Sequence, residues 1–588
     1  MNALRAFLCL VLFITAAPPA RAAEPTSGRK PNVLLVLLDD VGYGDFSCHG
    51  NPVMKTPQID KLHRENIRLT DFHVCPMCTP TRGQLLTGRD ALVNGAMNVA
   101  MGRTFLRRDF PTAADIFAAQ GYRTGHFGKW HLGDNYPYRP HDRGFQETIY
   151  SKSYGMASAA HYWNSTCFDD YYFHNGVAQK FAGYNTDLFF DAAMQFMKAR
   201  NDQKQPFFVY LPLTAAHGPQ WVAARYRAPY RDQQPRVADY FGMLANVDEN
   251  LGRLDTFLQK ERLKENTIVV LLSDNGIARG LPVFNAGMRG HKTQLYEGGH
   301  RVACFLRWPA GKLRPAGDVG GLTQCQDLLP TLIDLCGLKK ADAAFDGTSL
   351  AAVLRGDKPV MPDRTLVVQY SRMDAPRPRK GDACVLWRRW RLVADQELYD
   401  LRTDPAQKVN VLDKHPAVVE RMRSHYDKWW AKVERGVNEF QPIHVGSDAE
   451  NPSVLSSADW QDVMVAESDQ VRKGESPNGP WHIQVEKAGD YEISLRRWPA
   501  EADLAIAAAA PAFQGPENSQ YRAGRALPIA KARLRVGSID ESRPVNATDK
   551  AVTFQVKLRA GRTLLQTWFS DRDDKELCGA YYVYVRRR

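Results

Sequence analysis

Apolar residues form three continuous runs in the first half of the chain, at residues 33–38, 207–211 and 268–272. A continuous run without polar alternation is typical of a strand that is buried on both faces of a sheet. Between these runs, residues 187–199 and 240–260 carry apolar side chains at helical spacing. The pattern predicts an α/β fold in which helices pack on both sides of a mostly parallel sheet.

Polar residues follow each of these predicted strands. Asp39 and Asp40 come directly after the first run, and Asp274 and Asn275 come shortly after the third. His217 follows the second run. Open α/β sheets bind their ligands at the carboxyl ends of the strands. We therefore expect these side chains to lie close together at one edge of the sheet.

The hydrophobic pattern changes after residue 360. Short alternating segments predict a small antiparallel sheet: residues 365–370, 390–393 and 397–401. A helix is predicted over residues 416–433. The sequence thus indicates an α/β domain over residues 30–360 and an antiparallel subdomain over residues 361–440.

A second alternating region follows a polar stretch, residues 441–457, which we interpret as a linker. The alternating segments beyond it are residues 481–485, 490–495, 532–536, 552–556 and 581–585. Period-two alternation with Gly and Asn turns predicts an accessory β-sandwich over residues 458–588. Such a domain either anchors a protein to a polysaccharide or packs against the neighbouring α/β domain, and the sequence leaves both open.

The first 22 residues have the features of a secretory signal peptide. Arg5 gives a positive start, residues 7–17 are apolar, and residues 20–22 form an A-x-A cleavage site. No later segment is apolar enough to predict a membrane span. We expect an exported protein that is periplasmic or extracellular.

The chain is basic, with a formal charge of +12 that falls to +10 when the signal peptide and its two arginines, Arg5 and Arg21, are removed. A basic surface attracts polyanions, and sulfated polymers suit an exported protein. No nucleic-acid-binding motif is present, so no nucleic-acid partner is predicted. Surface arginines that serve solubility alone explain the charge equally well. Ten cysteines are encoded, and sequence alone does not give their connectivity.

The run from Cys78 to Gly88 carries the strongest chemical signal. Cys78-Thr79-Pro80-Thr81-Arg82, followed by Thr87-Gly88, resembles the C-x-P-x-R…T-G element of the type I sulfatase family. The resemblance covers roughly residues 30–440 and implies the alkaline phosphatase-like fold of that family. It also implies that a formylglycine-generating enzyme oxidises Cys78 to formylglycine. The hydrated aldehyde offers two hydroxyls on one carbon, so that one attacks sulfur and the other later expels the sulfate.

Residues 75–78 also read Cys-Pro-Met-Cys, which permits other interpretations. A C-x-x-C pair can be a thioredoxin-like redox site, a structural disulfide or two buried thiols. The redox interpretation explains neither Arg82 nor the Thr87-Gly88 pair. We therefore favour the sulfatase interpretation.

The strand-end acids resemble the two metal-binding elements of the family. Asp39 and Asp40 precede a Gly-Tyr-Gly-Asp run, and Asp274 and Asn275 precede a glycine. The resemblance implies that these four residues and the converted Cys78 bind one metal ion. Oxygen ligands suit Ca²⁺ or Mg²⁺ rather than zinc, and Ca²⁺ is the better match. The cation would polarise a sulfate oxygen and favour the ionised form of the aldehyde hydrate.

The resemblance also implies catalytic roles for residues in further motifs. Pro80 predicts a helix start, which places residue 78 at an anion-binding helix N-terminus, with Arg82 in the first turn. Residues 128–133 resemble the family's G-K-W-H-L-G element, in which Lys129 contacts the sulfate and His131 takes a proton during sulfate elimination.

Two motifs further along the chain supply the predicted general acid and a second sulfate ligand. Residues 217–219 resemble H-x-P, whose histidine lies beside the leaving-group oxygen, so His217 is the predicted general acid. Lys292 matches the family's sulfate-binding lysine. The role of the neighbouring His291 stays open.

The sequence therefore predicts a calcium-dependent sulfatase, an enzyme that hydrolyses a sulfate ester. A phosphomonoester or phosphonate hydrolase of the same superfamily is one alternative, and a non-catalytic envelope protein that binds carbohydrate is another. Export, the basic charge, the accessory sandwich and an aromatic-rich segment at residues 161–174 favour a sulfated carbohydrate as substrate. We interpret that aromatic segment as a wall of the substrate pocket, with a packed insertion as the alternative. The sugar, the sulfated position and the choice of endo or exo action are not predicted.

Overall fold

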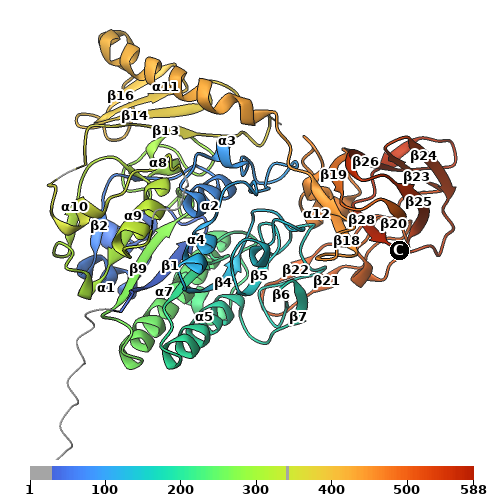
Figure 1. Ribbon diagram of the computed structural model, residues 1–588, viewed down its shortest axis with the longest axis horizontal. Coiled ribbons are helices and arrows are strands. Elements are labelled where there is room, and N and C mark those ends of the chain that lie inside the picture. Colours follow the sequence, from blue (N-terminus) through green and yellow to red (C-terminus); the bar gives the residue numbers. More distant parts are fainter. Residues whose placement is uncertain (1–28, 340–343, 360, 376) are drawn as a thin grey trace, which may run out of the picture.

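The computed structural model describes residues 29–339, 344–359, 361–375 and 377–588, so the predicted signal peptide lies outside the described residues. A ten-stranded sheet forms the centre of the α/β domain, which is the predicted catalytic domain (Figure 1). Its middle strand, β1 (Asn32–Leu38), pairs in parallel with β8 (Phe207–Pro212) on one side and β9 (Thr267–Ser273) on the other. These are the three strands predicted from the apolar runs.

The remaining strands extend the sheet in both directions in the order β11-β2-β10-β9-β1-β8-β4-β5-β6-β7. They are β2 (Ile67–Leu69), β4 (Arg123–Lys129), β5 (Glu147–Ser151), β6 (Tyr171–His174), β7 (Val177–Lys180), β10 (Cys304–Arg307) and β11 (Gly317–Val319). The five central strands are parallel, whereas β6, β7 and β10 run antiparallel to their neighbours. The prediction of a mostly parallel sheet between helices is confirmed.

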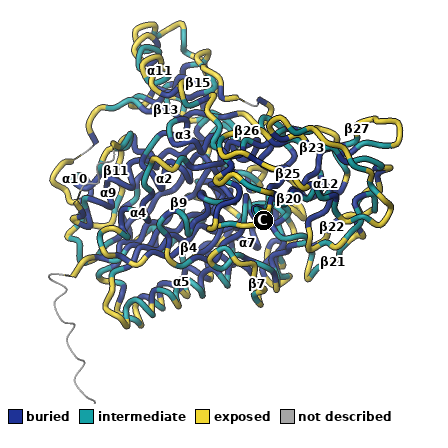
Figure 2. The backbone as a smooth tube through the Cα atoms, turned by 45° about the vertical axis from the view of Figure 1, so that its right-hand side comes forward, coloured by how far each residue is buried: buried dark blue, intermediate teal, exposed yellow. Residues whose placement is uncertain are grey.

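Helices cover both faces of the sheet. Leu34 and Val36 of β1 pack into the core beneath α5 (Asn185–Asp202) and α7 (Pro235–Lys260). The alternate residues of β1 face a second core beneath α4 (Ala113–Ala119) and α9 (Leu328–Leu335). Figure 2 shows the central strands as almost entirely buried. A strand with both faces buried needs apolar residues at every position, which explains the continuous runs in the sequence.

A four-stranded antiparallel sheet with one long helix forms the predicted subdomain. Its strands are β13 (Thr365–Gln369), β14 (Ala383–Trp387), β15 (Trp390–Val393) and β16 (Glu397–Asp400). The helix α11 (Pro416–Val437) packs Val419 and Met422 against this sheet. The sequence predicted all of these elements except β14.

The C-terminal region is a β-sandwich, as predicted. One sheet contains β17 (Ile443–Val445), β19 (Trp481–Val485), β23 (Lys531–Val536), β24 (Ile539–Pro544), β26 (Gly561–Ser570) and β27 (Glu576–Cys578). The other contains β18 (Ser453–Ser456), β20 (Gly489–Arg496), β25 (Val552–Leu558) and β28 (Tyr582–Arg587). The alternating side chains of both sheets meet in one core that includes Trp481, Ile493 and Phe554.

The stretch predicted as a linker, residues 441–457, belongs to the sandwich instead. β17 pairs in parallel with β19, and β18 pairs antiparallel with β28, so each sheet gains a strand from this stretch. The two strands contain only three and four residues, with a polar segment between them. Such short strands give too little alternation to be recognised in the sequence.

The sandwich is fused to the catalytic domain by a shared core and by a small hairpin. Phe105 and Tyr138 of the catalytic domain lie in the same apolar cluster as the sandwich core. The hairpin, β21 (Phe513–Gln514) and β22 (Gln520–Tyr521), extends from the sandwich toward the catalytic domain (Figure 1). Its Tyr521 joins the main catalytic core.

The remaining α-helices and strands are short. They are β3 (Phe72–His73), β12 (Thr323–Gln324), α1 (Pro57–Glu65), α2 (Cys78–Thr87), α3 (Ala91–Asn94), α6 (Ala224–Arg227), α8 (Glu297–His300), α10 (Ala351–Arg355) and α12 (Ser468–Lys473). All nine cysteines within the described ranges are free, including Cys75 and Cys78. In the same residues, the longest apolar stretch of any helix falls short of what is needed to cross a membrane.

Candidate active site

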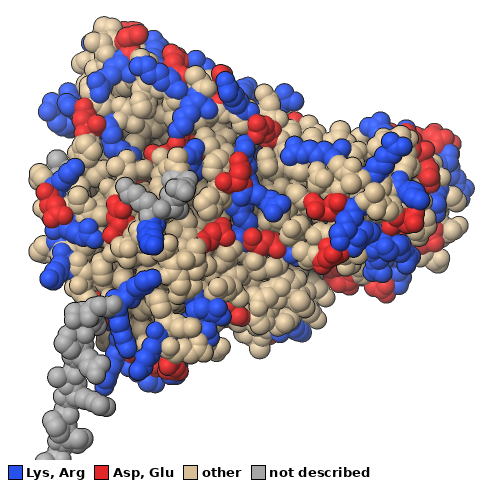
Figure 3. Space-filling view, in the orientation of Figure 1, with Lys and Arg blue, Asp and Glu red and all other residues tan. Residues whose placement is uncertain are grey.

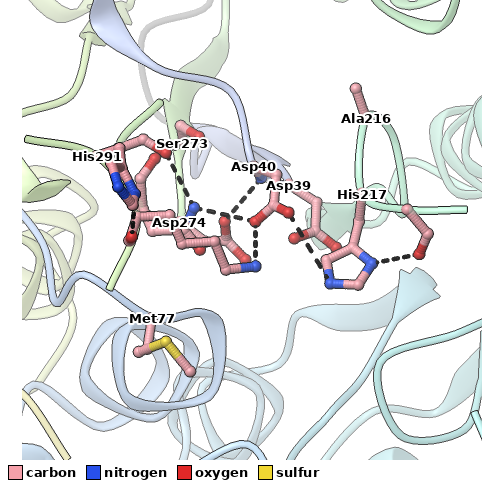
Figure 4. A network of polar contacts seen from close by, with 12 residues as sticks. Asp39, Asp40, Met77, Ala216, His217, Ser273, Asp274 and His291 are labelled. Atoms are coloured by element: carbon pink, nitrogen blue, oxygen red, sulfur yellow. Dashed lines mark hydrogen bonds and ion pairs between the residues drawn. The ribbon is translucent and has the colours of Figure 1, made fainter. Parts of the chain in front are cut away.

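The carboxyl ends of β1, β8 and β9 meet at one edge of the sheet, as expected. The backbone N–H of Asp40 donates to Oδ1 of Asp274 at 3.2 Å, and Nδ2 of Asn275 donates to Oδ1 of Asp40 at 3.0 Å. Nε2 of His217 lies 3.9 Å from Oδ2 of Asp40. Figure 4 shows the side chains of Asp39, Asp40 and Asp274 grouped between His217 on one side and His291 on the other.

Cys78 is the first residue of α2 and is buried against this acidic cluster. Its Sγ lies within 4.8 Å of carboxylate oxygens of both Asp39 and Asp274. Met77 before it is extended, and no side chain caps the helix. The first N–H groups of a helix without a side-chain cap favour an anion. The predicted helix N-terminus at residue 78 is therefore present.

Three cations pair with the three carboxylates. Nζ of Lys129 lies 2.6 Å from Oδ2 of Asp39, and Nη2 of Arg82 lies 2.8 Å from Oδ2 of Asp274. Nζ of Lys292 donates to Oδ1 of Asp40. Lys129 and Arg82 are fully buried, so each ion pair is needed to compensate a charge that has lost its water.

The local charges shift the pKa values of the carboxylates in opposite directions. Burial raises the pKa of Asp274 to about 6, with repulsion from Asp39 adding to this and attraction by Arg82 opposing it. Burial disfavours the charge of Asp40 too, but Lys292 and His217 together lower the pKa of that carboxyl well below its usual range. Asp40 is therefore a carboxylate at all physiological pH values.

Two buried oxygens of this cluster fit a hard cation. Among the described residues, Oδ1 of Asp39 and Oδ1 of Asn275 have no hydrogen-bond partner. Nδ2 of Asn275 donates to Asp40 and to the carbonyl of Gly276, which fixes the amide with its oxygen free. Buried oxygens without a donor are costly unless a cation binds them. Carboxylate and amide oxygens are the ligands that Ca²⁺ and Mg²⁺ prefer.

The two predicted catalytic histidines present different ring nitrogens. Nε2 of His131 lies 3.0 Å from the carbonyl of Val99, so Nε2 carries the proton, and Nδ1 is buried without a partner among the described residues. Burial first, and then the charge of Lys129, holds the pKa of His131 well below its usual value. A neutral imidazole with a free Nδ1 lone pair can accept a proton.

His217 has the reverse arrangement. Nδ1 lies 2.6 Å from the carbonyl of Gly218 and therefore carries the proton, while Nε2 faces Asp40. Burial lowers the pKa of His217 to about 3, although the nearby Asp40 raises it and the charge of Lys129 lowers it further. An added negative charge beside Nε2 would favour the protonated form.

Tyr154 lies between these histidines and was not predicted as a site residue from the sequence. Its ring centroid lies 6.0 Å from that of His131 and 5.6 Å from that of His217. Tyr154 follows β5 by three residues. It therefore obeys the same strand-end rule that located the acids, but no motif marked it.

A cavity of about 1100 Å³ opens over the site. Asp40, His217 and Lys292 line it, as do Tyr154 and His291. Further along, the cavity is lined by Arg236, Asp239 and Arg279 of the catalytic domain and by Glu467, Asn518, Gln520, Tyr521 and Arg522 of the C-terminal region. The cavity is therefore enclosed by both parts of the chain.

The aromatic-rich segment at residues 161–174 does not line this cavity within the described residues. Trp163 packs on Trp498 of the sandwich with ring centroids 5.4 Å apart, and the guanidinium of Arg472 stacks on Trp163 at 4.4 Å. The predicted pocket wall is therefore wrong, and the alternative of a packed insertion is correct. Aromatic rings suit both purposes, so composition could not separate them.

The fold and this cluster define a family. The chain belongs to the sulfatase family, whose model matches residues 31–338, and a second model, described as N-sulphoglucosamine sulphohydrolase, C-terminal, matches residues 290–431. The predicted enzyme class, sulfatase, is confirmed. The β-sandwich, whose first strand begins at Ile443, lies beyond both matches.

Individual relatives agree with this assignment. Arylsulfatase A of Homo sapiens is 31% identical over 382 residues, covering 57% of this chain and 70% of that protein. N-acetylgalactosamine-6-sulfatase of Canis lupus familiaris is 29% identical over 381 residues, covering 60% and 71%. Among solved structures, Ps i-CgsB in complex with k-i-k-neocarrahexaose is 26% identical with a TM-score of 0.63, covering 70% of this chain and 95% of that one.

Proposed function

We propose that this sulfatase removes sulfate from a sulfated carbohydrate, using a formylglycine made from Cys78 and one calcium ion. The observation that carries the proposal is the position of Cys78, at an uncapped helix N-terminus and within 4.8 Å of two carboxylates. An unmodified thiol is a poor nucleophile there, because burial raises its pKa above the usual range despite the nearby Lys129 and Lys292. Conversion by a formylglycine-generating enzyme removes that difficulty.

The two groups would supply distinct chemistry. Formylglycine at residue 78 supplies a geminal diol as nucleophile, and calcium neutralises sulfate charge and favours ionisation of that diol. The cation's ligands would be Asp39, Asp40, Asp274, Asn275 and residue 78. The orphaned oxygens of Asp39 and Asn275 support this set.

Lys129 and Lys292 would bind the sulfate. Each ammonium now pairs with a carboxylate of the cluster, Lys129 with Asp39 and Lys292 with Asp40. A cation shared by those carboxylates would weaken both pairs and leave the ammonium groups free to attract sulfate oxygens. Arg82 would stay in place, because it also donates to the carbonyl of Lys129 at 3.1 Å. It therefore holds the acids in position.

The histidines would move the protons. A bound sulfate adds negative charge next to Nε2 of His217, which raises the pKa of this imidazole and allows it to protonate the leaving oxygen. His131 offers its free Nδ1 lone pair as the base for the second half of the reaction. The two steps need opposite proton movements, which suits two separate histidines.

A carbohydrate substrate is favoured by the relatives and by the cavity. One relative is named N-acetylgalactosamine-6-sulfatase, and a similar structure, Ps i-CgsB, was solved in complex with k-i-k-neocarrahexaose. The cavity of about 1100 Å³ is slightly larger than the usual range of small-ligand sites, which leaves room for more than one sugar ring. An exported location, periplasmic or extracellular, is part of the proposal and rests on the sequence of residues 1–22.

The test compares four substrates with enzyme that was produced together with a formylglycine-generating enzyme. We expect sulfate release from sulfated oligosaccharides and from nitrophenyl sulfate, and much less product from nitrophenyl phosphate or a phosphonate ester. If the phosphate or phosphonate ester is hydrolysed as fast as the sulfate esters, the alternative of a phosphomonoester or phosphonate hydrolase is correct. If nitrophenyl sulfate turns over efficiently but no carbohydrate in a broad panel is desulfated, the carbohydrate proposal is wrong.

A further inference from the structure

The appended sandwich contributes directly to the wall of the active-site cavity. Residues of the β21–β22 hairpin and its flanks line the same cavity as His217 and Lys292. The lining residues from this region are Ala512, Asn518, Gln520, Tyr521 and Arg522. This wall lies outside both matched family segments, which end at residues 338 and 431.

The hairpin is held firmly against the loop that carries His217. Asn518 donates to the carbonyl of Gln220 at 3.1 Å and accepts from the N–H of Val222 at 3.2 Å. The ring of Tyr521 meets that of Trp221 edge to face, with centroids 5.3 Å apart. The hydroxyl of Tyr521 also donates to the carbonyl of Ser165 at 2.6 Å. The hairpin is therefore a fixed part of the site.

Three exposed arginines from three separate segments of the chain reach this cavity. Arg236 lies at the start of α7, Arg279 follows β9, and Arg522 follows β22 directly. Among the described residues, none of the three side chains forms an ion pair or donates a hydrogen bond. Figure 3 shows Lys and Arg side chains over both the catalytic domain and the sandwich on the face it presents.

The acids of the cavity do not neutralise these arginines. Asp40 pairs with Lys292, and Asp239 lies 3.6 Å from Arg227. Glu467 is the acid of the wall that has no cationic partner among the described residues, and it would oppose an anion bound beside it. The cavity beyond the catalytic cluster therefore keeps unpaired guanidinium groups, whose planar forks match sulfate and carboxylate.

We infer that Arg522, together with Arg236 and Arg279, forms a subsite for a second anionic group of the substrate, so that the sandwich helps to select multiply charged saccharides. This inference rests on the proposed function. The scissile sulfate binds at the cluster of Lys129 and Lys292, and a sulfate or carboxylate on a neighbouring sugar binds the arginines. The appended domain is then a specificity element of the active site.

The test uses nitrophenyl sulfate turnover as the reporter and a sulfated carrageenan hexasaccharide as the competitor. Charged hydrogen bonds to an anion predict that Arg522→Ala raises the ratio of the competitor's Ki to the KM for nitrophenyl sulfate about tenfold. Arg236→Ala and Arg279→Ala should also raise this ratio of Ki to KM. Arg525→Ala is the matched control, because Arg525 is exposed in the same segment but does not line the cavity.

Two further results separate the outcomes. The desulfated hexasaccharide should compete weakly, and its Ki should not respond to Arg522→Ala. If wild-type enzyme is not inhibited by the sulfated hexasaccharide, or if Arg522→Ala and Arg525→Ala have equal ratios, the subsite does not exist. That failure is distinct from failure of the proposed function, which is decided by whether any carbohydrate releases sulfate.

Discussion

Arg82 is the buried counter-ion of the acidic cluster, and its removal should expose how much a cation contributes there. Its guanidinium donates to Oδ2 of Asp274 from Nε at 3.1 Å and from Nη2 at 2.8 Å, and it is fully buried. Arg82→Met keeps an unbranched side chain but removes the charge. Breaking a buried ion pair by removing one partner costs about 3–5 kcal/mol. We expect Arg82→Met to lower the free energy of unfolding by that amount when a chelator has removed free metal ions.

Calcium should recover much of this loss. A cation bound between Asp39 and Asp274 replaces the positive charge that Arg82 supplied, so the calcium-induced rise in thermal midpoint should be larger in Arg82→Met than in wild type. Arg391→Met is the matched control. Arg391 is also buried and pairs with two acids, donating to Glu297 at 2.7 Å and to Asp71 at 3.0 Å. No cation is proposed there, so calcium should not rescue it.

The loss of stability in Arg82→Met should also depend on pH. The pKa of Asp274 is already about 6 through burial and Asp39, and loss of Arg82 raises it further. A folded-state pKa above the unfolded value gives stability that is lost as pH rises through the folded pKa. Arg82→Met should therefore be more destabilised at pH 8 than at pH 5. The assay is the first thermal unfolding midpoint in chelator and in excess calcium. Equal calcium shifts in both arginine variants would refute the reasoning.

Three more predictions concern the metal and the histidines. Chelation should abolish most activity and calcium should restore it, and metal analysis of active enzyme that finds only zinc would contradict the oxygen-ligand site. His217→Ala should slow a sugar sulfate far more than nitrophenyl sulfate, because a good leaving group needs little acid assistance. Equal losses on both substrates would remove His217 from that role. His131→Ala should release about one equivalent of alcohol per enzyme and then stall, since only the second half of the reaction needs its base. A linear time course without a burst would overturn this assignment.

Local sequence patterns predicted the catalytic sheet and the cluster at its edge. Continuous apolar runs mark doubly buried strands, and parallel strands bring their carboxyl ends to one edge, so Asp39 and Asp274 had to meet although they lie far apart in sequence. Helix α2 was predicted from Pro80 and places Cys78 at its N-terminus. These features depend on the chain's own pattern and on general rules of sheet topology.

The walls of the cavity could not be predicted in this way. The strands β21 and β22 contain two residues each, which is too short for any period to be visible. The contacts of Asn518 and Tyr521 with the catalytic domain join residues that are 298 and 356 positions apart, and they depend on how two domains dock. Trp163 likewise packs on the sandwich because of that docking. Side-chain type alone does not fix such contacts.

Mass spectrometry of the peptide that contains residue 78 tests the central claim most directly. Trypsin cleaves after Arg68 and Arg82, so residues 69–82 form one peptide with both Cys75 and Cys78. Active enzyme should yield this peptide with an aldehyde at residue 78 that a hydrazide traps, while Cys75 remains a thiol that is alkylated in the same spectrum. Fully active enzyme whose Cys78 is also alkylated as a thiol would contradict the account.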